Sequence, residues 1–146
     1  MNLPHYRYFI SDDFQDYEFY SEGSKGRIKK AVFFKKIQEY PVIYNMAFGD
    51  KDETGIVNDL VTTDNGDRDV VLATVAHTIN DFCDHYGDHY IYAEGSTSSR
   101  TRLYQISISR QLHEISIDFD VYGLKYGIFH KFQKNVNYDA FLVKRK

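Results

Sequence analysis

Cysteine, proline and tryptophan are scarce or absent in this chain. The only cysteine, Cys83, has no second thiol with which to form an internal disulfide, which excludes the disulfide-stapled folds of small secreted proteins. A single thiol fits a reducing compartment, so the sequence predicts a cytoplasmic protein. With two prolines and no low-complexity tract, the chain also shows no linker that would separate domains.

Long apolar runs are missing as well. Residues 1–13 have no continuous apolar core, which argues against a secretory signal, and the uncharged run 40–49 reaches about half the length that a membrane helix needs. We therefore expect no membrane association. The net charge of −3 excludes a global positive field that would attract nucleic acid, although a local basic patch stays compatible with it. A chain of 146 residues fits one domain, residues 1–146, with a sizeable core.

Aromatic side chains are abundant: there are 13 tyrosines and 11 phenylalanines. Such residues favour strands and pack well on the faces of a sheet. The connections between the early strand-like segments are too short for parallel crossovers, which indicates antiparallel pairing. The pattern predicts an α+β fold, an antiparallel β-sheet with two helices packed on it, in the order βββ(β)αβαβββ. The expected strands cover residues 6–10, 16–21, 27–37, 42–48, 56–61, 90–93, 115–121, 128–132 and 140–143.

The clearest helix is predicted over residues 69–86. Its apolar residues recur at three- and four-residue steps, which builds one apolar stripe, and Gly87 follows as a plausible stop. Before it, Asn65-Gly66 marks a tight turn, and Asp67 or Asp69 can cap the helix start. We expect this helix to bury four stripe residues against the sheet: Val71, Val75, Ile79 and Phe82.

The strongest functional signal lies where the second helix, predicted over 98–110, begins. A helix start offers free backbone N–H groups and a partial positive charge, so it binds anions readily. Hydroxyl and guanidinium groups suited to phosphate or carboxylate gather there. The candidate ligand-binding residues are Ser96, Thr97, Ser98, Ser99, Arg100 and Arg102.

The same residues have an ordinary structural interpretation. Serine and threonine commonly cap helices, and the two arginines could pair with Asp64, Asp67 or Glu94. Residues two apart do not share a helix face, so the arginines converge on one anion only if Arg100 lies near the helix start. The segment also lacks the glycine and lysine spacing of a phosphate-binding P-loop.

Metal binding is not expected. His77, Asp81 and His85 recur at four-residue steps, as helical metal ligands can, but we interpret them as a solvated helix face. The acidic turn at 64–67 does not follow the register of a calcium loop. The sequence therefore predicts no metal and no cofactor. Cations at 27–36 and 144–146 could form a basic patch, although lysines that protect strand edges are the commoner use.

Several segments together resemble an uncharacterised family of small bacterial proteins that is typical of Bacteroidetes. They are YNMAFGD at 44–50, TDNGDRDVVLATVA at 63–76 and GSTSSRTRLY at 95–104, together with residues 19–30 and 138–146. The resemblance implies no catalytic residues. It does imply a setting beside helix-turn-helix proteins, as in toxin–antitoxin or defence modules.

Two hypotheses for function follow. The first is a binding protein that contacts a phosphate-containing ligand, RNA or a protein partner through the 95–102 segment. The alternative is a toxin that acts on RNA or a nucleotide, in which the arginines hold phosphate and a tyrosine or histidine is the acid or base. The spacing of the residues identifies no acid–base pair, which favours binding, and leaves open whether the protein is an enzyme.

Overall fold

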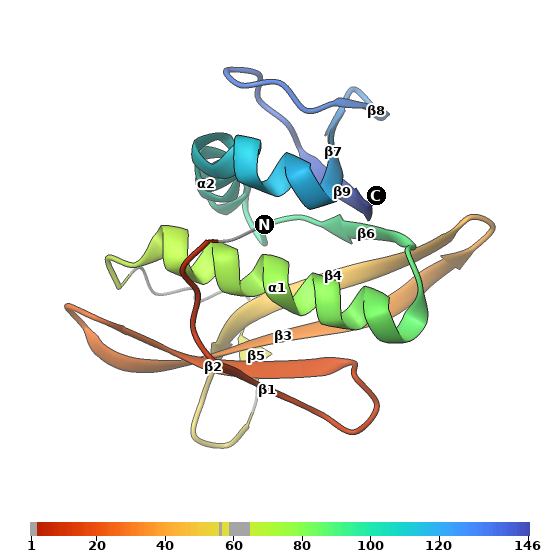
Figure 1. The fold of residues 1–146 in the computed structure, drawn as a ribbon. Coiled ribbons are helices and arrows are strands. Elements are labelled where there is room, and N and C mark those ends of the chain that lie inside the picture. Colours follow the sequence, from red (N-terminus) through yellow and green to blue (C-terminus); the bar gives the residue numbers. More distant parts are fainter. Residues whose placement is uncertain (1–2, 56, 59–64) are drawn as a thin grey trace.

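A computed structural model describes residues 3–55, 57–58 and 65–146. Strands dominate the first half of the chain, and the two helices follow in its middle and second half (Figure 1). The elements are β1 (Tyr8–Ile10), β2 (Asp16–Gly23), β3 (Gly26–Glu39), β4 (Val42–Lys51), β5 (Val57–Asn58), α1 (Arg68–Tyr86), β6 (Tyr90–Ala93), α2 (Ser98–Asp118), β7 (Phe119–Lys125), β8 (Ile128–Lys131) and β9 (Ala140–Arg145).

The strands form one sheet in the order β1-β2-β3-β4-β6-β9-β7-β8, and β5 pairs with β4. The early strands form the expected antiparallel meander. β4 and β6 are the exception: they run parallel, with Tyr44 opposite Ile91, because α1 carries the chain across between them. The predicted α+β class and order of elements are confirmed, with one parallel pair that the sequence did not indicate.

Both helices cover the same face of the sheet. α1 lies in front of β3 and β4, and α2 lies beside it, toward β7 and β9 (Figure 1). Along β3, alternate residues point to this face, and Val32 and Phe34 are buried there. As expected, Val75, Ile79 and Phe82 of α1 are buried, whereas Val71 is only partly buried.

The predicted strand at 115–121 is partly wrong. Residues 115–118 continue α2, and the strand begins only at Phe119. Ile108, Leu112 and Ile115 recur at four- and three-residue steps and face the core together. Ile117, which strand alternation would place on the same face as Ile115, is 55% exposed. The alternation of isoleucine and serine therefore resembled a strand although the buried positions follow the helical period.

The N-terminal segment crosses the outside of α1 before it enters β1 (Figure 1). The Tyr6 amide donates to Thr74 Oγ1 over 2.9 Å. Further along the helix, the His5 ring stacks on His77 at 3.7 Å and the Phe14 ring stacks on His85 at 4.3 Å. The interpretation of this helix side as a solvated face is therefore partly wrong: chain segments before β2 pack on it and half-bury His77 and Asp81, whereas His85 stays exposed.

Candidate functional site

The start of α2 is built by a close approach of the chain after β6. A Cβ atom on Gly95 would lie 2.5 Å from the backbone nitrogen of Thr101, so only glycine fits there. The Gly95 amide donates to Thr101 Oγ1 over 2.9 Å, and Thr97 Oγ1 accepts from the Arg100 amide at 3.2 Å. Thr97 thus acts as the helix cap, as the structural interpretation of this segment anticipated. Ser96, Ser98 and Ser99 are exposed around it.

The two arginines of the segment point to different places. Arg100 Nη1 donates to Ser96 Oγ over 2.5 Å, and the side chain is half-buried. Arg102 is exposed and its Nη1 donates to Asn137 Oδ1, 3.1 Å away, in the loop between β8 and β9. The structure therefore does not bring them together on one anion. The proposed pairing with Asp64 falls on a residue outside the described ranges.

Arg100 lines a cavity of about 210 Å³ between α1, α2 and the sheet. The walls are mostly aliphatic and aromatic, and both helices contribute to them. None of the cavity was evident from the sequence. Its lining residues are Lys30, Met46, Phe48, Asp67, Arg68, Val71, Leu72, Val75, Ala76, Ile79, Ile91, Ala93, Glu94, Arg100, Leu103, Tyr104, Ser107, Ile108, Ile115, Phe119, Val121, Phe141 and Val143.

Charged side chains line the cavity where both helices begin. Arg68 and Arg100 come from the first turns of α1 and α2. Lys30 reaches the cavity from β3 and is 1% exposed, with its Nζ 2.7 Å from Asp50 Oδ1 on β4. Lys30, Val32 and Phe34 are two residues apart, so they lie on the same face of the strand. This spacing is the sequence signal that could have placed Lys30 on the inner face.

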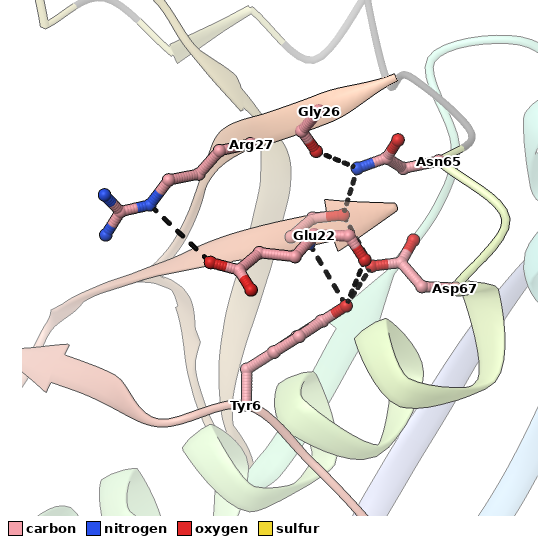
Figure 2. A network of polar contacts seen from close by, with 7 residues as sticks. Tyr6, Glu22, Gly26, Arg27, Asn65 and Asp67 are labelled. Carbon is pink, nitrogen blue, oxygen red and sulfur yellow. Dashed lines mark hydrogen bonds and ion pairs between the residues drawn. The ribbon is translucent and has the colours of Figure 1, made fainter. Parts of the chain in front are cut away.

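A polar network fixes the chain that leads into α1 (Figure 2). Asp67 Oδ2 accepts hydrogen bonds from the Tyr6 and Ser21 hydroxyls, each at 2.5 Å. Asn65, 1% exposed, donates from Nδ2 to the Gly26 carbonyl at 2.7 Å, and its Oδ1 accepts from the Lys25 amide at 2.6 Å. The network ties the start of α1, and so one end of the cavity, to the β2–β3 hairpin.

This network corrects the expected role of the acidic turn. Asp67 occupies the cap position of α1, but its side chain makes no capping hydrogen bond. The carboxylate turns instead toward Tyr6 and Ser21, two hydroxyls that are distant in sequence. Asp69 is in the first turn of the helix. Its Oδ2 lies 3.1 Å from Arg110 Nη2 of α2.

Other titratable groups with shifted pKa values lie mostly toward the opposite end of α1. Burial raises the pKa of the Cys83 thiol to about 11, and burial also raises the pKa of Tyr17. The Tyr8 hydroxyl donates to the Asp81 carboxylate, and burial together with that carboxylate raises the pKa of Tyr8. These shifts keep the groups protonated near neutral pH, so none of them is a ready base or nucleophile.

The histidines and acids were also considered as metal ligands. Among the described residues, no three His, Cys, Asp or Glu side chains gather where they could hold one ion. The expectation of no bound metal stays a prediction.

Many of the cations that could have formed a basic patch are paired with acids. Most of the ion pairs join neighbouring strands or residues close in sequence, and Arg145 joins β9 to the end of α1. They are Arg27 with Glu22, Lys29 and Lys51 with Glu18, Lys30 with Asp50, Lys36 with Glu39, and Arg145 with Asp84 and Asp88.

Neither helix, over the part of the chain that the structure describes, has the length and apolarity to cross a membrane. Comparisons with curated proteins and with solved structures find no match. A family model does match, over residues 2–146, and this span includes every segment on which the resemblance rests. The chain therefore belongs to DUF6934, a family of unknown function.

Proposed function

We propose that this protein binds an anionic ligand where α2 begins, with Arg100 as the main contact. The observation that carries the proposal is the position of Arg100. Its guanidinium bonds to Ser96 at the helix start while the same side chain lines the cavity. An anion placed there would meet a charged donor in the electropositive first turn of a helix.

The surroundings of Arg100 favour an anion over a cation. Arg68 lines the same cavity, and the N-terminus of α1 adds a second partial positive charge. Lys30 also lines the cavity, but its charge is already paired with Asp50. Asp67, one of the acids in the lining, already accepts hydrogen bonds from two hydroxyls. The ligand classes that fit are phosphate-containing molecules, including RNA, and carboxylates, free or carried by a protein partner. The single cysteine supports a cytoplasmic location.

The test compares Arg100→Gln with Arg102→Gln. Titration calorimetry with inorganic phosphate and with a short RNA oligonucleotide measures affinity, and thermal melting measures stability. Arg100→Gln should weaken binding by roughly 1.5–3 kcal/mol through loss of a charge-assisted hydrogen bond. Arg102→Gln is the matched control and should have little effect, because Arg102 bonds to Asn137 instead.

Two results would contradict the proposal. One is a lower melting temperature for Arg100→Gln with unchanged affinity, which would make Arg100 a structural residue. The other is equal weakening by both substitutions, which would indicate a diffuse surface charge effect instead of a site at Arg100.

A toxin that acts on RNA or a nucleotide, in a bacterial toxin–antitoxin or defence module, is the alternative. It would need an acid–base pair near Arg100. Tyr104 lines the cavity together with Arg100 and is a candidate acid or base. The tyrosines with the most strongly raised pKa values, Tyr8 and Tyr17, lie toward the other end of α1. Growth arrest on expression, relieved by a neighbouring gene product, would favour this alternative over binding.

A further inference from the structure

The cavity behind Arg100 is larger than packing defects usually are. Protein interiors pack as densely as organic crystals, and voids above the size of a water molecule are few. An engineered cavity of about 150 Å³ in another protein holds benzene, which has six carbon atoms. By proportion, the cavity of about 210 Å³ between α1, α2 and the sheet has room for about eight carbon atoms.

Its walls suit an apolar chain. Val75 and Ile79 of α1, Ile108 of α2 and Phe141 of β9 line it, and all four are buried. Because the walls offer few polar partners, water within the cavity would make few hydrogen bonds. A hydrocarbon chain has no hydrogen bonds to give up, and its transfer from water into the cavity is favourable.

One polar group inside the cavity has no partner. Ser107 lines the cavity from α2 and is 1% exposed, and its Oγ makes no hydrogen bond among the described residues. A buried hydroxyl without a partner is unfavourable by itself. Ser107 also has a small side chain, so a larger apolar residue at this position would take up part of the cavity.

We infer that the cavity binds the hydrocarbon body of an amphiphilic anion: a straight chain of about eight carbons with a carboxylate or phosphate head. The head lies at Arg100, as the proposed function requires, and the chain extends between α1 and α2 past Ser107. The first turn of α2 holds no acidic residue, so a bound anion there also offsets the repulsion between Arg100 and the helix dipole.

The experiment measures the affinity of the full chain for octanoate, octyl phosphate, octanol and acetate by titration calorimetry. Each buried methylene should strengthen binding by about fourfold, so octanoate should bind at least about a hundredfold tighter than acetate. Octyl phosphate tests the other head group. Octanol has the chain without the charge and should bind at least about tenfold more weakly than octanoate.

Two matched substitutions on α2 test where the hydrocarbon chain of the ligand lies. Ser107→Leu fills part of the cavity and should reduce octanoate affinity at least about tenfold. Ser109→Leu makes the same change at a half-buried position outside the cavity lining and should leave the affinity within about twofold. If Ser107→Leu does not fold, Ala76→Leu fills the cavity from α1 instead, and the same loss is expected.

The outcomes separate the two proposals. Equal affinity for octanoate and acetate, or octanoate affinity unchanged by a cavity-filling substitution that folds, would overturn the inference and leave the anion site of the proposed function standing. Equal affinity for octanoate and octanol, together with no effect of Arg100→Gln, would overturn the anion site and with it the amphiphile.

Discussion

The two ends of α1 are packed in different ways. Toward its C-terminus, Phe82 lies within aromatic stacking distance of three rings, with centroids 4.2 Å from Phe34, 4.7 Å from Tyr86 and 4.8 Å from Tyr44. Toward its N-terminus, Val71 and Leu72 line a cavity of about 210 Å³ that they share with α2. One end is filled and the other is open, although one helix supplies both.

The two ends of α1 differ in what their packing contributes. Close aromatic packing contributes stability through buried area and favourable ring geometry. The cavity end lacks part of that contribution, and Arg68 and Arg100 line the cavity there. Regions that sacrifice packing and concentrate charge are where binding sites are found. We therefore assign stability to the aromatic end and propose ligand binding at the cavity end.

The largest expected effect of a substitution is on the aromatic end. Phe82→Ala removes a side chain that is fully buried against three rings, and should lower the free energy of unfolding by about 3–5 kcal/mol. Urea denaturation measures the change. The matched control at the cavity end is Leu103→Ala, which should be clearly milder because Leu103 lines the open end and is 40% exposed. Similar losses for both would remove the distinction between the two ends.

A smaller effect is expected from alkaline pH, again at the aromatic end. The pKa of the Cys83 thiol is about 11 in the folded protein against an ordinary 9.0, because burial disfavours the thiolate. A raised acid pKa gives stability that is complete below pH 9 and is lost as pH rises toward 11. Cys83→Ala should therefore flatten the fall in unfolding free energy over this range by up to about 2 kcal/mol.

Urea denaturation of both proteins at pH 7.5, 9 and 10 checks this. The quantity to compare is the slope of the unfolding free energy against pH, because the substitution itself also changes the absolute stability. Some loss should persist in Cys83→Ala, because burial also raises the pKa values of Tyr8 and Tyr17. Identical slopes of unfolding free energy against pH for the two proteins would show that the pKa of the Cys83 thiol is not raised by burial.

The smallest expected effect concerns the helix cap at the start of α2. Thr97→Ala removes the side-chain cap on the Arg100 amide and should destabilise the protein by about 1 kcal/mol. Ser98→Ala, its exposed neighbour, should change stability by less than about 0.5 kcal/mol. Thermal melting of the two variants measures this difference, and a larger loss for Ser98→Ala would mean that the cap is assigned to the wrong hydroxyl.

Local patterns made much of the fold predictable. The stripe of α1 and the alternation of the early strands depend on neighbours in sequence, and both led to correct elements. The end of α2 was missed because Ile115 and Ile117 fit a strand and a helix equally well over four residues, and only tertiary burial distinguishes them. The parallel pairing of β4 and β6 depends on where α1 returns the chain, which has no local signal.

The site was predictable only in part. Hydroxyls before a helix revealed the start of α2 and its cap, because capping is a local interaction. The cavity joins residues from α1, α2 and five strands, so its volume follows from packing that a sequence pattern does not contain. Asp67 shows the same limit, since its expected capping role is replaced by bonds to Tyr6 and Ser21, which are distant in sequence.

The most direct test of the division between the two ends is an NMR titration of isotope-labelled protein with octanoate. The account predicts that backbone amide signals shift around Gly95, Arg100 and Ser107, while those around Phe82 and Tyr86 stay in place. Shifts centred on the aromatic end, or shifts spread evenly over α1, would contradict it.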